Sequence, residues 1–378
     1  MKPLRRILAA VDFDDTSTPL LAAVGTLAKQ FGSEVVLTHA VEPDDELAAG
    51  DEKLNAIIKA RLEEMQNELV ASGVVVPQLI VTHGKPLAEI TATAEKLNAN
   101  LIVLGARAVA ADHQFALGTT TEKVIRKSAK PVLAVHPERP LSFANILCPV
   151  DFSNASARGL TNAIQFARAF HGRLHVLTVM PPPSKYHRLD RSWTQWAVTA
   201  EAAAASRHVR EFDEFLCRFN FRDVQWQKNI ARGDPAEEIV ASAKSGNADL
   251  IVMGSVGRTG LPYMLMGSTA VKVARQLPCA LLTVKHAGAI DELHGEELRT
   301  IQILFAEGKA LLAAQSFDAA LMKFDHVLAR DSFHAGALQG RADALQHLGN
   351  VPDAKGSRCR AIVIEEVEVG QYELGEGD

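Results

Sequence analysis

The chain has 378 residues, of which 47% are hydrophobic and 22% are charged. A chain of this length is expected to hold two or three domains, each able to bury its own core. The formal net charge of −5 argues against a protein that binds nucleic acid by neutralising its phosphates. No apolar run reaches about 18 residues, so we expect no membrane-spanning helix. The N-terminal segment lacks the long apolar region of a signal peptide, which favours a cytoplasmic location.

A repeat of about 140 residues occupies most of the chain. Ile7–Phe13 reads ILAAVDF, and the similar ILCPVDF begins 139 residues later at Ile146. Leu101–Gly105 reads LIVLG, and the similar LIVMG begins 149 residues later at Leu250. The change in spacing places about ten additional residues in the second copy. Such self-similarity predicts a duplicated domain, with the first copy in residues 1–140 and the second in residues 141–287.

Each copy alternates short apolar runs with amphipathic segments, which predicts strands that alternate with helices. In the first copy we expect strands at Ile7–Val11, Glu34–Val41, Val74–His83, Leu101–Gly105 and Val132–Val135. In the second copy we expect them at Ile146–Val150, Leu174–Val179, Val224–Ala231, Leu250–Gly254 and Ala280–Val284. The fold class is therefore α/β, with two tandem Rossmann-like domains that each contain a five-stranded parallel sheet.

A glycine pattern follows the fourth expected strand of the second copy. Its spacing is G-x2-G-x9-G-S, formed by Gly254, Gly257, Gly267 and Ser268. Glycines allow a phosphate chain to approach backbone amides, and a helix that begins after Gly267 offers free N–H groups to an anion. The hydroxyls of Ser268 and Thr269 and the guanidinium of Arg258 are further candidate phosphate ligands. The alternative interpretation is that these are ordinary turn glycines.

This pattern, together with the Val-Asp pair that ends the first strand, resembles the signature of ATP-binding universal stress proteins. The resemblance covers residues 1–287 and implies an adenine nucleotide alpha hydrolase-like fold that binds ATP, with Mg²⁺ as an accompanying ion. It implies that Asp151 lies near the adenine and ribose, and that Val179 holds the adenine through its backbone. The neighbouring Val150 and Met253 belong to the same expected site.

The first copy departs from this signature. Ala108 stands where the second glycine is expected, although Gly105, Gly118 and Thr119 are retained. A weaker nucleotide site is therefore expected there, formed by Val11, Asp12, Val41, Gly105, Gly118 and Thr119. The alternative is a pseudo-site that is kept for packing between the halves. Asp12 and Asp151 also have an alternative role as caps of the following helices.

Residues 288–378 have a different character. Leu304, Gly308 and Phe324 follow the spacing of a tetratricopeptide repeat, and a shift of 34 residues gives a weaker second unit with Arg358 in place of the aromatic. The segment resembles that helical repeat and is a candidate surface for a protein partner within residues 300–365. The alternative is a plain helical extension, followed by an acidic tail.

Three functions remain open from the sequence. The first is a universal stress protein that binds ATP as a regulatory ligand. The second is a slow ATPase or phosphotransferase, although no catalytic residue and no metal site is evident and no G-x4-GK-[ST] loop is present. The third is a scaffold that acts through its helical segment and binds no nucleotide. Because relatives in the resembling family dimerise through an edge strand, the resemblance also implies an internal pseudo-dimer and leaves a homodimer open.

Overall fold

The structure is a computed structural model of the chain. It describes residues 4–42, 52–106, 118–180, 194–255, 266–285, 295–330, 334–358 and 361. The chain forms two compact units, one made of residues 2–185 and 223–292 and the other mainly of residues 186–222 and 293–378. Among the described residues, none of the helices is both long and apolar enough to span a bilayer.

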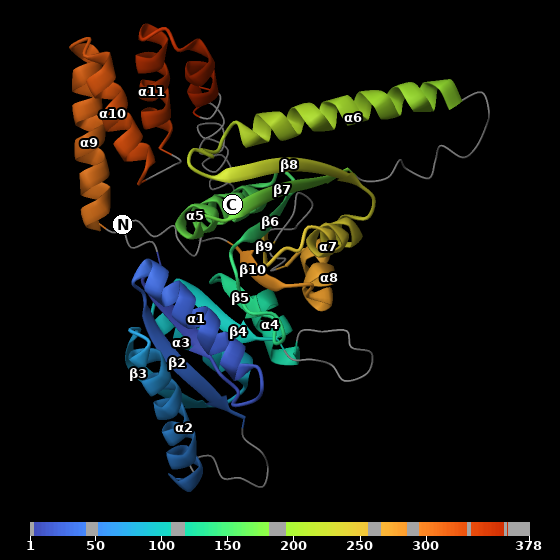
Figure 1. Cartoon of the computed structure of the whole chain (residues 1–378), viewed down its shortest axis with the longest axis vertical. Coiled ribbons are helices and arrows are strands. Elements are labelled where there is room, and N and C mark those ends of the chain that lie inside the picture. The colour runs from blue at the N-terminus through green and yellow to red at the C-terminus, as the bar shows by residue number, and fades with distance from the viewer. Residues whose placement is uncertain are drawn as a thin grey trace, which may run out of the picture. The chain divides into compact units, whose positions relative to one another are not determined.

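The first unit is built on one ten-stranded sheet (Figure 1). The strands of the first half are β1 (Arg6–Ala10), β2 (Glu34–Val41), β3 (Val75–His83), β4 (Leu101–Gly105) and β5 (Val132–Val135). Those of the second half are β6 (Asn145–Val150), β7 (Arg173–Met180), β8 (Gln225–Arg232), β9 (Leu250–Gly254) and β10 (Ala280–Val284). The order across the sheet is β3-β2-β1-β4-β5-β10-β9-β6-β7-β8, so the second half repeats the first in reverse.

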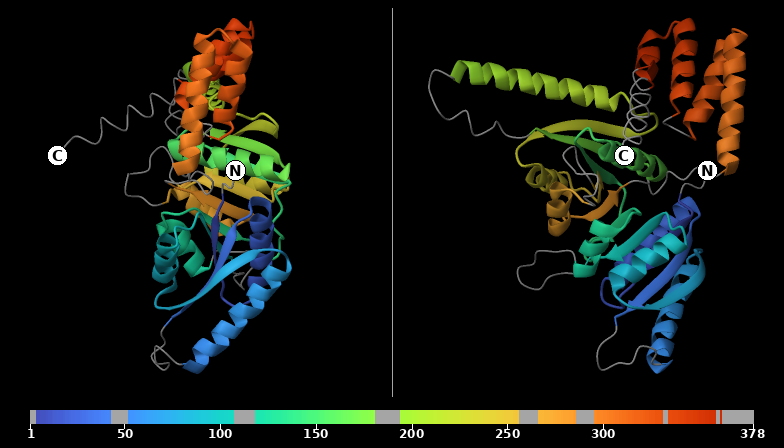
Figure 2. Two further views of the ribbon diagram at one scale, coloured as in Figure 1. Left: turned by 90° about the vertical axis from the view of Figure 1, so that its left-hand side faces the viewer. Right: turned by 180° about the vertical axis from the view of Figure 1, so that it is seen from behind.

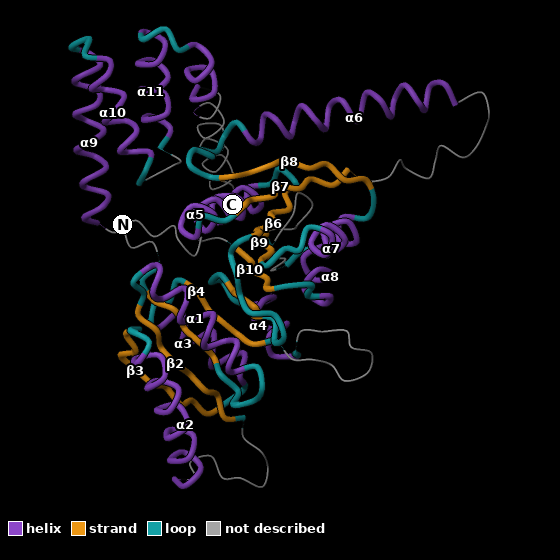
Figure 3. Tube along the Cα trace, viewed as in Figure 1, coloured by secondary structure: helices purple, strands orange, loops and turns teal. Residues whose placement is uncertain are grey.

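The two halves meet at β5 and β10, which pair antiparallel, whereas all other neighbours in the sheet pair in parallel. Leu281 stands opposite Ala134, and Thr283 stands opposite Val132. The two expected five-stranded parallel sheets are therefore joined edge to edge into one continuous sheet (Figure 3). This junction turns β5 and β10 into central strands, which explains why both are fully buried.

Helices cover both faces of the sheet. In the first half, α1 (Ser17–Phe31) and α2 (Glu52–Ala71) contact each other on one face, while α3 (Pro86–Lys96) and α4 (Thr119–Lys127) contact each other on the opposite face. In the second half, α5 (Asn154–Phe170) packs on β6, β7, β9 and β10, and α7 (Pro235–Ser245) packs beside α8 (Ser268–Gln276). Since α4 also contacts α8, the layer of α3, α4, α7 and α8 continues from one half into the other (Figure 2).

The core explains why these short apolar runs become strands. Strands that are covered on both faces need apolar residues at every position. The first four residues of β4, Leu101–Leu104, and the first four of β9, Leu250–Met253, are all buried. One cluster of buried side chains contains residues from both halves, such as Ile102, Val124, Ile251 and Val273.

The second unit is helical. It contains α6 (Thr194–Leu216), α9 (Gly295–Ala313), α10 (Phe317–Leu328), α11 (Ala335–His347) and a further helical segment at residues 351–358. The ring of Phe324 is fully buried and lies against Gly308 and Gly340, where an added Cβ would overlap it. The structure thus has helices where the tetratricopeptide spacing predicts them, but identification with that repeat stays a prediction. The sequence placed α6 in the second α/β domain, whereas its contacts group it with the C-terminal helices.

Candidate functional site

The start of α8 lies at the carboxyl edge of the second half. Gly267 is the N-cap residue, and no described side chain caps the helix. The amide of Gly267 donates to the carbonyl of Ser255 at 2.6 Å, which fixes the helix start beside the end of β9. Ser268 is exposed and Thr269 is half-buried. The first N–H groups of α8, together with the positive end of the helix dipole, are therefore suited to an anion.

Gly254 has a packing role at this edge. A Cβ at this position would lie 2.5 Å from the carbonyl carbon and oxygen of Ala155 and 2.8 Å from the amide nitrogen of Ser156. Real Cβ atoms do not approach backbone so closely, so only glycine lets β9 end against the first turn of α5. The sequence assigned Gly254 to phosphate approach, and the geometry adds that the glycine allows the helix to pack on the strand.

Asp151 organises the start of α5. One of its carboxylate oxygens accepts hydrogen bonds from the amide of Ser153 at 3.1 Å and from its hydroxyl at 2.6 Å. The Ser153 hydroxyl in turn accepts from the amide of Ser156 at 3.2 Å and caps the helix. Asp151 is therefore not itself the N-cap residue but holds the cap in place, with Val150 buried just before it.

The second strand of the later half ends one residue beyond the position expected from the sequence. β7 ends at Met180 rather than at Val179. The amide of Gly233 donates to the carbonyl of Met180 at 3.2 Å, just as the amide of Gly84 donates to the carbonyl of Val41 at 2.9 Å. Val41 therefore corresponds to Met180, and the two residues chosen from the sequence, Val41 and Val179, are not equivalent positions.

The first half has the same framework with different side chains. Gly118 is the N-cap residue of α4, and no described side chain caps this helix. Thr119, the first residue of the helix, is exposed. The hydroxyl of Thr121 donates to the carbonyl of Gly105 at 2.9 Å, where the second half has Ala270. A Cβ at Gly105 would overlap the side chain of Thr16, so this glycine is also required for packing.

His39 is a feature of the first half that the sequence analysis missed. Its Nδ1 lies 2.8 Å from the carbonyl oxygen of Val11, and its ring lies 4.5 Å from that of Phe13 between centroids. The offset of 139 residues places Thr178 at the equivalent position of the second half. An imidazole thus lies beside Val11, next to Asp12, at the edge where the weaker site was expected. The sequence THAV in β2, which places this histidine near the end of the strand, was the signal that could have pointed to it.

The structure describes some of the remaining expected site residues and not others. Met253 is buried at the end of β9. Gly257, Arg258 and Ala108 lie outside the described residues. Within the described ranges, no group of three or more His, Cys, Asp or Glu residues is arranged to hold a metal ion.

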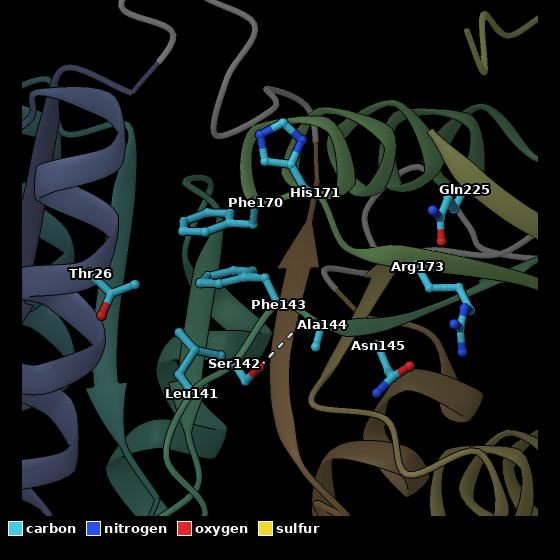
Figure 4. Close-up of a pocket in the computed structure, with 10 residues that line it drawn as sticks. All are labelled: Thr26, Leu141, Ser142, Phe143, Ala144, Asn145, Phe170, His171, Arg173 and Gln225. Atoms are coloured by element: carbon cyan, nitrogen blue, oxygen red, sulfur yellow. Dashed lines mark hydrogen bonds between the residues drawn. The ribbon is translucent and has the colours of Figure 1, made fainter. Parts of the chain in front are cut away.

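One described pocket lies elsewhere. It has a volume of about 610 Å³ and is lined by residues that include Ser142, Phe143, Phe170, His171 and Arg173. Figure 4 shows the stacked rings of Phe143 and Phe170 below His171, and the bond from the amide of Ala144 to the hydroxyl of Ser142. Asn145, Arg173 and Gln225 begin β6, β7 and β8, so this pocket opens at the amino edge of the sheet. It contains none of the residues expected to bind nucleotide.

Comparison with known proteins matches both halves to one family. Residues 3–136 and 142–285 each match the Universal stress protein family. A universal stress protein of Mycolicibacterium smegmatis is 24% identical over 292 residues, covering 74% of this chain and 96% of that protein. The crystal structure of a universal stress protein from Archaeoglobus fulgidus superposes with a TM-score of 0.56 and 23% identity, covering 75% of this chain and 98% of that one. A universal stress protein solved in complex with cAMP matches 36% of this chain and 97% of its own, with a TM-score of 0.30 and 22% identity.

Proposed function

Because the chain belongs to the universal stress protein family, we propose that it binds ATP in its second half as a regulatory ligand. The observation that carries this proposal is the start of α8, where an uncapped helix end meets a glycine-rich sequence beyond β9. Backbone amides and the helix dipole favour a phosphate group at such a place. Hydroxyls at Ser268 and Thr269 can add donors to the same oxygens.

The rest of the proposed site lies along the same edge. Val150 ends β6 and Asp151 follows it, Val179 precedes Met180 at the end of β7, and Met253 and Gly254 end β9. Since the carboxyl ends of parallel strands form one edge, a ligand there can contact β6, β7 and β9 at once. Gly257 and Arg258 are added to the proposed phosphate loop on the basis of the sequence alone.

The first half is the weaker candidate. It shares the uncapped helix start at Gly118 but carries Ala108 in the loop and the His39 imidazole beside Val11. The first loop lacks the glycine that would let a phosphate approach the backbone, and the imidazole stands where the second half has the smaller Thr178. We therefore assign binding mainly to the second half.

Turnover is not part of this proposal. A regulatory ligand needs only differential binding, whereas rapid hydrolysis needs a positioned base and phosphate-clamping cations. The sequence supplies neither a Walker-type lysine nor an evident general base. We propose that the protein acts in the cytoplasm and that residues 300–365 contact a protein partner.

A charge placed at the helix start tests the site. We expect Ser268→Asp to weaken ATP binding at least about tenfold, because the carboxylate occupies the anion position and repels phosphate. The same change should leave the melting temperature equal or higher, since an acidic residue stabilises the first turn of a helix. Calorimetric titration with ATP, ADP and cAMP measures binding, and thermal unfolding measures stability.

Thr119→Asp is the matched control, because Thr119 is likewise the exposed first residue of its helix, α4. Because Thr119 belongs to the weaker candidate site, Thr119→Asp should leave the affinity of the tighter site in the second half within about twofold of the wild type. If Ser268→Asp binds ATP as tightly as the wild type, the site is assigned wrongly. If the wild type itself binds no adenine nucleotide, the scaffold function is favoured instead.

A further inference from the structure

Lys285 follows β10, the strand that pairs with β9 next to the proposed phosphate site. It follows Val284, the last residue of β10, which stands opposite Gly254 in the sheet. The amide of Ser255 donates to the carbonyl of Val284 at 2.9 Å, and the carbonyl of Ser255 accepts from Gly267. Two hydrogen bonds therefore connect the start of α8 with the residue next to Lys285.

The side chain of Lys285 crosses into the first half. It is only 3% exposed, and its Nζ donates to the carbonyl of Arg126 at 2.8 Å. Arg126 lies in the last turn of α4, where unpaired carbonyls give the helix a partial negative charge that suits an ammonium group. The Lys285 carbonyl accepts a bond from Nε of Arg158 on α5 at 2.5 Å, so both ends of this residue are held.

The other end of α4 carries the candidate site of the first half. The helix begins after Gly118, and Thr121 ties its first turn to the carbonyl of Gly105 at the end of β4. Glu122 in the same turn pairs with Arg275 of α8 at 3.0 Å. A helix of nine residues is a rigid rod of about 13 Å. It therefore connects the contact at Lys285 with the helix start at Gly118.

We propose that Lys285 couples the two halves, so that an adenine nucleotide bound in the second half changes the stability of α4 in the first. This proposal rests on the proposed function of the second half. A ligand that orders the start of α8 also orders Ser255 and Val284, which hold Lys285 in place. The bond from Lys285 to the last turn of α4 then opens less often, and α4 becomes more protected.

Hydrogen exchange with and without saturating ATP tests the coupling. In the wild type we expect ATP to slow exchange in the last turn of α4 and its C-cap, residues 124–128, by about threefold or more, and to leave α3 unchanged. Lys285→Met keeps the length of the side chain but removes its donors. It should still bind ATP, while the ATP effect on α4 disappears.

Arg139→Met is the matched control. The guanidinium of Arg139, in the first half, donates to the carbonyl of Pro278, in the second half, at 3.0 Å. Like the bond of Lys285, this bond joins a cation to a carbonyl of the other half, but it lies at the opposite end of β10. Arg139→Met should keep the ATP effect on α4. Four results would overturn the coupling but not the proposed function. The first is that the wild type binds ATP with no change in the exchange of α4, and the second is that ATP changes α4 equally in Lys285→Met. The third is loss of the ATP effect in both variants, and the fourth is loss of ATP binding in Lys285→Met. Absence of ATP binding by the wild type would overturn the proposed function together with the coupling.

Discussion

Lys285 carries an amine in a place that water hardly reaches. Burial lowers the pKa of Lys285 from 10.5 to about 8, because the charged form loses its hydration. The unfolded chain titrates this amine near its ordinary value. Between about pH 8 and pH 10.5 the unfolded chain therefore binds a proton that the folded chain does not, and this residue favours folding increasingly as the pH rises.

This linkage predicts a difference between two lysines. Relative to Lys285→Met, the wild type should gain about 2 kcal/mol in free energy of unfolding between pH 7.5 and pH 10. Lys272→Met is the control, because Lys272 is 59% exposed on α8 and should keep the wild-type pH dependence. Chemical denaturation at both pH values measures the three proteins. A constant difference between wild type and Lys285→Met would contradict a buried, depressed amine.

The candidate site could be predicted from the sequence only in part, and the reasons lie in single residues. Spacing located Gly267 and Ser268 at a helix start, because glycine and hydroxyl residues have local roles that spacing preserves. It did not reveal that Gly254 packs on Ala155, or that Asp151 holds the Ser153 cap, since both depend on how α5 meets the sheet. Nor did it reveal that His39 lies within hydrogen-bond distance of the carbonyl of Val11, which depends on how β1 and β2 pair.

At the scale of elements, the linker between the halves depends on one glycine. A Cβ at Gly172 would overlap the carbonyl oxygen of Phe143, and Gly172 precedes the first residue of β7. Phe143 is itself fixed, because its ring stacks on that of Phe170 with centroids 3.8 Å apart. The obstacle is backbone rather than a flexible side chain, so it cannot move aside cheaply.

We expect Gly172→Ala to lower the free energy of unfolding by about 2–4 kcal/mol, because the overlap forces the linker away from β7. Gly25→Ala is the contrasting variant, since a Cβ at Gly25 in the middle of α1 would meet only Leu69 at an ordinary 3.6 Å. It should stabilise the protein by about 0.5–1 kcal/mol through helix propensity. Urea denaturation of both variants gives the two signs, and equal signs would contradict this account of Gly172.

Strands and helices were predicted well because their apolar periods are local. The fourth and fifth strands of the first half, for example, were expected with the bounds that the structure has. The end of β7 was predicted wrongly by one residue because strand ends depend on pairing, here the bond from Gly233 to Met180. The pairing of β5 with β10 could not be derived from spacing, because it depends on how two separate halves face each other.

At the scale of the whole α/β unit, the two halves share more than a linker. They share one sheet through β5 and β10, one cluster of buried side chains, and the aromatic contacts of Phe31 with Phe166 and Phe170. The side-chain amide of Gln30 (Nε2) also donates to the carbonyl of Ala169, so α1 and α5 meet directly. Domains that share a continuous core are expected to unfold together rather than one after the other.

This shared core predicts that a substitution that destabilises one half also lowers the stability of the other. Leu62 is fully buried on α2, far from the junction, and Leu62→Ala should cost about 2–5 kcal/mol through the cavity it leaves. If the unit unfolds cooperatively, the most protected amides of β6 and β7 should exchange faster by the same free energy as those of β1 and β4. Ile57→Ala on the same helix is the control, because Ile57 is 68% exposed and its loss should change neither set. Faster exchange in β1 and β4 alone would mean that the halves unfold separately, and that the shared sheet does not connect their stabilities.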